Sequence, residues 1–321
     1  MKLKESCRER IALFPKDLFN LQHFSREALE EILNRAEFYK ERDGKDTFQA
    51  LKGKDIALSF WEPSTRTSFS FQQAIHKLGG RVIEFKPEIS SVQKGESIED
   101  TIKALLSLGA SALVFRHRWP GLFQQIAEKI EIPIISGGEG CYQHPTQALL
   151  DLFTLRQTGL DLNGLSVVLV GDILHSRVAR SLFYLLPLFG VKLTLVAPPV
   201  FLPLELVPPG ADYSFNLEDN LPKGDVLYFL RVQKERQESG LLSSLGEYAA
   251  LYGLNKKRLA LLKKDVYIMH PGPVNIGVEI SYHALKYLEE KFPQKLLIHK
   301  QIQNGVYVRM AVLDLLVGRK V

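Results

Sequence analysis

The sequence has few cysteines and no long apolar run. Only two cysteines, Cys7 and Cys141, occur in 321 residues, which is too few for a disulfide framework and suits a reducing cytoplasm. No stretch reaches about eighteen consecutive apolar residues, so we expect no membrane span. The charged N-terminus lacks the apolar segment of a secretory signal. The sequence therefore predicts a cytoplasmic protein that is not held in a membrane.

Familiar nucleotide, metal and hydrolase signatures are also missing. The Walker pattern Gly-x-x-x-x-Gly-Lys-Ser/Thr is absent. Residues 167–172 resemble the first strand of a dinucleotide-binding fold, but residues 173–177 lack the second and third glycines, so their side chains would keep a pyrophosphate away. We find no carboxylate pair and no Ser-His-Asp arrangement, and the pair Cys141 and His144 alone is a weak metal signature. We expect neither a cofactor nor a metal.

The composition is that of an ordinary globular protein. Apolar residues make up 45% and charged residues 24% of the chain, and the length allows two domains. The net charge is +5 and the pI about 9.0. Because the basic residues are spread along the sequence, we do not expect nucleic-acid binding. The basic excess suits a small, strongly anionic substrate.

Apolar strand patterns alternate with helical patterns along the whole chain. This alternation predicts an α/β fold with two domains, each a parallel β-sheet flanked by helices. The pattern restarts after Gly159 and Gly164, so we expect domains at 1–150 and 151–300, with a C-terminal helix (301–321) that packs back on the first domain. Strands are expected at 56–61, 81–85, 112–116, 133–136, 165–170, 192–196, 226–231 and 266–269, and helices at 21–42, 65–78, 98–108, 124–129, 146–156, 177–189, 255–262 and 301–316.

The turn from Glu62 to Thr67 is the strongest candidate for a binding site. It joins a buried strand to an apolar helix, with Ser64 as the expected N-cap and Arg66 in the first helical turn. A cation there opposes the helix dipole, and a bound anion would remove the conflict. A capped helix with an exposed arginine explains Ser-Thr-Arg-Thr equally well. The strand before and the helix after favour an anion site.

The segment His144-Pro145-Thr146-Gln147 opens another predicted helix. Pro145 suits the first helical position and favours an extended backbone at His144. His144 and Gln147 could then lie side by side, with His144 as a donor to a substrate carbonyl. A structural N-cap histidine is the alternative.

Further polar residues follow the other predicted strands. Arg116 and Arg231 end predicted strands, and Arg177, Gln233 and the loop 271–273 follow strands. Because ligands of open parallel sheets bind beyond the carboxyl ends of strands, these side chains together predict an arginine-lined receptor for anions. Taken singly, Arg177 could be a surface arginine, and 231–236 could be a charged, solvated segment.

Six segments together resemble the aspartate and ornithine carbamoyltransferases, in the family's order, from about residue 16 to the C-terminus. They are 62–67, 90–96, 144–151, 171–177, 231–233 and 270–275. Ornithine members carry a cysteine in a His-Cys-Leu-Pro stretch, whereas Pro271 follows His270 here. Two arginines also suit an acceptor with two carboxylates. Ile276 departs from the family, whose aspartate-type members usually have arginine there, which puts a local charge contact in doubt.

The resemblance implies a transferase that moves the carbamoyl group of carbamoyl phosphate to L-aspartate. The products are N-carbamoyl-L-aspartate and phosphate, in the committed step of de novo pyrimidine (UMP) biosynthesis. By resemblance, the catalytic residues are Arg66, Thr67, Arg116 and His144. The residues implied for carbamoyl phosphate are Ser64, Thr65, Arg66, Thr67, Arg116, His144 and Gln147, those for aspartate are Lys94, Arg177, Arg231 and Gln233, and those for backbone contacts to the carbamoyl group or product are Gly272 and Pro273.

The resemblance also implies a homotrimer with shared sites. Ser90 and Lys94 would reach the site of a neighbouring subunit from a mobile loop. Association with a regulatory chain or a dihydroorotase stays open. Two other functions also stay open: a transcarbamylase for ornithine or another amine, and a non-catalytic paralogue that binds anions.

Overall fold

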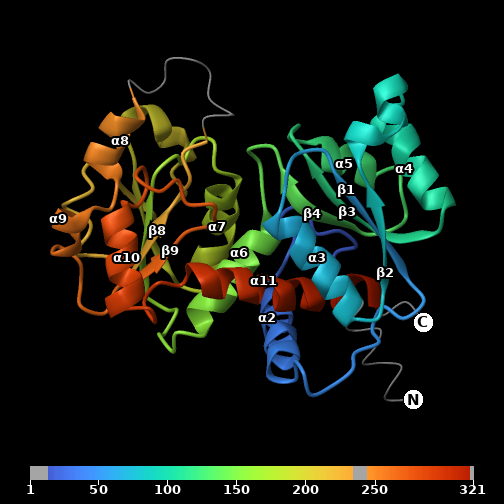
Figure 1. Cartoon of the computed structure of the whole chain (residues 1–321), viewed down its shortest axis with the longest axis horizontal. Helices are drawn as coiled ribbons and strands as arrows, with labels where there is room; N and C mark the ends of the chain where they lie inside the picture. The colour runs from blue at the N-terminus through green and yellow to red at the C-terminus, as the bar shows by residue number, and fades with distance from the viewer. Residues whose placement is uncertain (1–13, 234–243, 319–321) are drawn as a thin grey trace. The chain divides into compact units, whose positions relative to one another are not determined.

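The structure, a computed structural model, describes residues 14–233 and 244–318 (Figure 1). Backbone contacts divide the chain into two compact units. The first combines the residues up to Phe153 with those from Ile302 onward, and the second spans Thr154–Gln301. Both boundaries fall inside helices, namely α6 (Pro145–Arg156) and α11 (Ile298–Leu313).

The first unit is built on a four-stranded parallel sheet with the order β2-β1-β3-β4. Its strands are β1 (Asp55–Phe60), β2 (Arg81–Phe85), β3 (Ala110–His117) and β4 (Ile134–Glu139). The helices are α2 (Arg26–Glu41), α3 (Arg66–Lys77), α4 (Ile98–Ser107), α5 (Leu122–Ala127) and the first part of α6. The alternation of strand and helix that the sequence predicts is confirmed in this unit.

Strand residues of opposite parity face opposite sides of this sheet, as the two-residue period requires. On one side Leu113 and Phe115 of β3 join a core cluster with Ile102 of α4 and Phe123 of α5. All of these side chains are at most 3% exposed. Burying each such side chain contributes about 1.5–3 kcal/mol, so the cluster fixes α4 and α5 on the sheet.

The C-terminal segment packs back on the first unit, as expected. From α11, Asn304 accepts a hydrogen bond from Lys40 at 3.0 Å, and Tyr307 donates one to Asp43 at 2.8 Å. A five-residue π-helix (Asp314–Gly318) follows α11, and its Asp314 forms an ion pair with Arg35 at 3.5 Å.

The second unit is built on a five-stranded parallel sheet with the order β7-β6-β5-β8-β9. The strands are β5 (Ser166–Val170), β6 (Lys192–Val196), β7 (Asp212–Ser214), β8 (Val226–Phe229) and β9 (Tyr267–Met269). The helices are α7 (Arg177–Leu188), α8 (Leu245–Tyr252), α9 (Lys256–Leu259) and α10 (Tyr282–Lys291). The predicted fold class, two parallel-sheet domains flanked by helices, is therefore confirmed.

Several local predictions differ from the structure. The sequence pattern did not predict β7, α8 or α10. The strand expected at 133–136 extends further in the structure, because β4 pairs with β3 as far as Glu139. The loop that carries Ser90 and Lys94 contains two short 3₁₀ turns, Pro87–Ile89 and Ser91–Lys94. For β4 the tertiary pairing outweighs the local pattern, and β7 and the 3₁₀ turns are very short elements.

Among the described residues, the structure contains no helix that is both long and apolar enough to cross a bilayer.

Candidate functional site

Each sheet has one topological switch point, where successive strands stop being added on one side of the first strand and are added on its other side. In the first sheet it lies between β1 and β3, and in the second between β5 and β8. Open parallel sheets bind ligands beyond the carboxyl ends of the strands at such points. The turn that contains Arg66 follows β1, Arg116 lies near the end of β3, Arg177 follows β5 and Arg231 follows β8. The predicted residues therefore gather at the expected edge of each sheet.

The turn after β1 presents a basic helix start. Helix α3 begins at Arg66 and its N-cap is Thr65, whose side chain makes no capping hydrogen bond. The expectation that Ser64 is the N-cap is therefore wrong. The Ser64 hydroxyl instead accepts a hydrogen bond from Arg116 Nη1 at 3.4 Å. Arg66 and Thr65 are exposed, whereas Thr67 is buried.

Arg116 links three parts of the first unit. Its Nη1 also donates to the Gly137 carbonyl of β4 at 3.3 Å, and its Nε lies 3.4 Å from Glu62 Oε2. The Arg116 side chain is only 13% exposed. Because these contacts come from the β1–α3 turn and from β4, the guanidinium is held across the carboxyl edge of the sheet.

His144 and Gln147 lie at the start of α6. The helix begins at Pro145, as expected, and the His144 carbonyl accepts hydrogen bonds from the backbone N–H groups of Gln147 and Ala148. The buried His144 ring places Nε2 3.5 Å from the Thr67 hydroxyl. Two residues that are 77 positions apart in the sequence, one from each predicted motif, are thereby brought together.

Two buried ionisable groups lie next to this edge. His117 and Glu139 are paired across β3 and β4. Burial lowers the pKa of His117 to about 4, although the Glu62 charge opposes the shift. Burial raises the pKa of Glu139 to about 7, although backbone N–H groups of 121–123 oppose it. His117 packs against both tryptophans, Trp61 and Trp119, so we assign it a packing role.

Arg177 opens helix α7 in the second unit. Ser176 is the N-cap and accepts a hydrogen bond from the Ala179 N–H at 3.1 Å. Arg177 is only 7% exposed, so the alternative of an ordinary surface arginine does not fit. A cation in the first turn of a helix opposes the helix dipole, and a bound carboxylate would add a favourable interaction with it.

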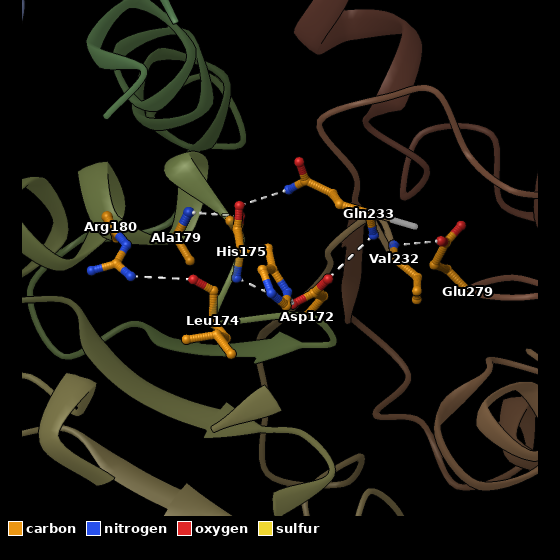
Figure 2. A network of polar contacts seen from close by, with 9 residues as sticks. Asp172, Leu174, His175, Ala179, Arg180, Val232, Gln233 and Glu279 are labelled. Atoms are coloured by element: carbon orange, nitrogen blue, oxygen red, sulfur yellow. Dashed lines mark hydrogen bonds and ion pairs between the residues drawn. The ribbon is translucent and has the colours of Figure 1, made fainter. Parts of the chain in front are cut away.

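Two buried carboxylates hold the segment after β8 (Figure 2). Asp172 accepts hydrogen bonds from the backbone N–H of Gln233 at 3.2 Å and from His175 Nδ1 at 2.8 Å. The Gln233 amide donates to the His175 carbonyl at 3.1 Å. Glu279 accepts from the Val232 N–H at 2.8 Å. Residues 231–233 are thus tied down, and residues 234–236 of the charged segment lie outside the described residues.

The loop after β9 is also supported from within the second unit. The His270 N–H donates to Gln301 Oε1 at 3.1 Å, and the Gly272 N–H donates to His270 Nδ1 at 2.9 Å. Gly272 has a φ of +67°, a conformation that glycine adopts without strain. Pro273 follows it. Ile276 is 56% exposed.

The loop expected to serve a neighbouring subunit lies between β2 and α4. Ser90 caps the second 3₁₀ turn by accepting from the Val92 N–H at 3.3 Å, and Lys94 is exposed. Over the ranges 14–233 and 244–318, no group of three or more His, Cys, Asp or Glu residues could hold a metal ion.

The sequence interpretation missed the acidic residues that support the predicted binding segments. Glu62, Asp172 and Glu279 each pair with or position a predicted binding segment. Glu62 and Asp172 lie inside segments that resemble the family. That location was the only feature of the sequence that could have indicated their supporting role. Glu279 had no such feature, because its partner Val232 is 47 residues away.

Two family models match nearly the whole chain. The carbamoyl-phosphate-binding domain of the aspartate/ornithine carbamoyltransferases matches residues 16–157, and their Asp/Orn-binding domain matches residues 163–316. The chain belongs to the aspartate/ornithine carbamoyltransferase family.

Its relatives include aspartate carbamoyltransferase catalytic subunits. That of Desulforudis audaxviator is 46% identical over 83% of this chain and 85% of its own length. That of Moorella thermoacetica is 42% identical over 94% and 97%. A crystal structure of the Trypanosoma cruzi aspartate transcarbamoylase, in complex with carbamoyl phosphate and aspartate, has a TM-score of 0.86 at 30% identity over 95% of this chain and 98% of that one. The catalytic subunit from M. jannaschii has a TM-score of 0.82 at 34% identity over 95% and 99%.

Proposed function

We propose that this chain is a carbamoyltransferase that uses L-aspartate as its acceptor. The observation that carries the proposal is the gathering of arginines, hydroxyls and a histidine at the carboxyl edges of both sheets, in a chain whose relatives are named aspartate carbamoyltransferase catalytic subunits. The first unit would bind carbamoyl phosphate and the second would bind aspartate.

In the first unit, the turn after β1 would hold the phosphate. Ser64, Thr65 and Thr67 offer hydroxyls, Arg66 offers a guanidinium fork, and the start of α3 offers the positive end of the helix dipole. Arg66 would also offset the charge that develops on the leaving oxygen.

The carbamoyl group would lie beside Thr67, Arg116 and His144. These three side chains would polarise its oxygen, and the 3.5 Å approach of Thr67 to His144 supports their common role. His144 needs only to donate one hydrogen bond, so a neutral ring suffices. Gln147 would orient the carbamoyl NH₂ group.

In the second unit, Arg177, Arg231 and Gln233 would hold the two carboxylates of aspartate. The loop at Gly272 and Pro273 would contribute backbone contacts. Two arginines match a dicarboxylate and disfavour ornithine, whose ammonium group would add a cation.

In the reaction, the aspartate amine attacks the carbamoyl carbon. A C–N bond forms, the C–O bond to phosphate breaks, and the amine proton passes to the departing phosphate. The protein contributes positioning and electrostatic stabilisation.

The proposal is tested by measuring phosphate release from carbamoyl phosphate with aspartate or ornithine as the acceptor. Release with aspartate alone is the expected result. Release with ornithine would overturn the acceptor assignment, and binding of carbamoyl phosphate without release would favour the non-catalytic paralogue. Arg66→Ala should lower kcat about 10²–10³-fold. The matched control is Arg81→Ala, which removes an exposed arginine paired with Asp55 at the opposite edge of the same sheet.

The active assembly would be a homotrimer with shared sites in the cytoplasm, supplying pyrimidine biosynthesis. Ser90 and Lys94 would then act in the site of a neighbouring subunit. Mixing inactive Arg66→Ala and Lys94→Ala subunits should restore activity, because some sites would receive both intact residues. Mixed trimers without any recovered activity would refute the sharing of sites.

A further inference from the structure

We propose that Asp151 is a positioning residue that fixes the amide orientation of Gln147 through the hydrogen bond between their side chains. The inference rests on the proposed function, because it concerns how the same site distinguishes carbamoyl phosphate from an analogue without an NH₂ group.

Gln147 and Asp151 lie one turn apart on the same face of α6. The Gln147 amide Nε2 donates to Asp151 Oδ1 at 3.0 Å, and Asp151 is 1% exposed. An ionised carboxylate only accepts hydrogen bonds, so it must face the NH₂ end of the amide. The Oε1 end then points to the other side. A carbamoyl NH₂ group is a donor and needs this acceptor.

Arg309 of α11 is a buried cation that interacts electrostatically with Asp151. Its guanidinium is buried, donates to the Gly305 carbonyl at 3.1 Å, and lies 3.5 Å from the Thr146 hydroxyl. Burial lowers the pKa of Arg309 to about 9, and the Asp151 charge opposes this shift. Arg309 therefore stays charged at neutral pH, and its positive charge attracts the Asp151 side chain.

The surroundings of Arg309 are shaped to admit its guanidinium. The guanidinium lies over the ring of Phe71 with 5.0 Å between its carbon and the ring centroid. A Cβ at Gly305 would lie only 2.5 Å from Arg309 Nη1, so a larger residue would displace the guanidinium. These contacts hold the guanidinium of Arg309 in place between α11 and the side chain of Phe71.

Replacing the carboxylate by an amide should reverse the orientation of Gln147. In Asp151→Asn, the guanidinium of Arg309 would attract the new carbonyl oxygen, leaving the new NH₂ group to face Gln147. Gln147 would then turn its own oxygen inward and present its NH₂ group to the carbamoyl NH₂ group. Two donors would oppose each other.

The experiment compares carbamoyl phosphate with acetyl phosphate, whose methyl group replaces the NH₂ group. N-carbamoyl-aspartate formation is followed with acetyl phosphate as a competitor, which yields a KM for one compound and a Ki for the other. In Asp151→Asn the preference for carbamoyl phosphate should fall about tenfold. A general loss of packing would weaken both compounds alike and leave this ratio unchanged.

Four further variants define the result. Thr154→Val is the matched control, since it removes another buried polar group from α6, and it should leave the ratio unchanged. Gln147→Ala should lose the preference by itself, and adding Asp151→Asn should then change nothing more. If Asp151→Asn does not fold, Asp151→Leu/Arg309→Met removes both buried charges together and should lower the preference at least about threefold.

An unchanged ratio in an active Asp151 variant would overturn the positioning role and leave the proposed function standing. A parent chain that forms no N-carbamoyl-aspartate would instead refute the proposed function itself.

Discussion

The paired His117 and Glu139 should make opposite contributions to the pH dependence of stability. The pKa of Glu139 is raised from 4.5 to about 7, so the folded state keeps a proton that the unfolded state loses. Its stabilising contribution is complete below pH 4.5 and is lost as the pH rises to about 7. The pKa of His117 is lowered from 6.5 to about 4, so its contribution is present above pH 6.5 and is lost as the pH falls to about 4.

Each shift corresponds to about 3 kcal/mol of unfolding free energy at its full extent, at about 1.4 kcal/mol per pH unit. Between pH 4.5 and 6.5 the two slopes have opposite signs and nearly equal size. The parent protein should therefore show almost no net pH dependence from this pair, and removing one member should reveal the slope of the other.

In the parent, Glu139 Oε1 accepts a hydrogen bond from the Phe123 N–H at 3.1 Å. Glu139→Gln keeps a carbonyl oxygen that can accept this hydrogen bond. Relative to the parent, its unfolding free energy should rise by about 3 kcal/mol from pH 4.5 to 6.5. His117→Asn keeps an acceptor for the Trp119 N–H, which donates to His117 Nδ1 at 3.1 Å. Its unfolding free energy should fall by about the same amount over that range.

Urea unfolding followed by tryptophan fluorescence suits this test, because Trp61 and Trp119 are the chain's only tryptophans and both belong to the first unit. The comparison concerns slopes with pH, so a constant loss of packing in either variant does not affect it. Parallel curves for the parent and both variants would refute the reasoning.

Three other substitutions test separate features. Glu62→Gln weakens the charged contact to Arg116 Nε and should raise the KM for carbamoyl phosphate about threefold to tenfold; an unchanged KM would show that Arg116 does not need this partner. Gly171→Ala should destabilise the second unit by about 2–4 kcal/mol in circular-dichroism unfolding, because φ is +129° and the new Cβ would lie 2.9 Å from the Tyr248 hydroxyl; a change below about 0.5 kcal/mol would contradict this. Ser25→Ala removes the N-cap of α2 and should cost about 1 kcal/mol, visible as a lower urea midpoint; an equal midpoint would exclude a capping contribution.

The order of most strands and helices could be predicted because hydrophobic period and turn residues are local properties. Pro145 opens α6, as the sequence indicates. The cap of α3 was predicted wrongly because Ser64 has a distant partner, Arg116, that local rules do not include. β4 continues into its glycines for a similar reason, since pairing with β3 outweighs their low strand propensity.

The residues of the candidate site also fall into two groups: those that local sequence patterns indicate and those that depend on distant partners. The sequence predicts cationic ligands because a cation in the first turn of a helix conflicts with the dipole, and their role in binding stays a prediction. The structure shows that Arg177 is buried in such a position. Its precise surroundings could not be predicted, because they depend on residues that meet only in the folded chain.

The acids behind the predicted ligands show why a sequence pattern alone underestimates this site. Anion binding requires positive charge, and a carboxylate near the binding groups weakens the attraction for the anion. Yet Asp151 holds the Gln147 amide, Asp172 holds the Gln233 backbone and Glu279 holds the Val232 backbone, and all three carboxylates are at most 1% exposed. Because a buried carboxylate is stable only with several donors around it, each one also fixes the groups that surround it. The same acids therefore limit the positive charge at the edges of the two sheets and also hold the proposed binding groups in place.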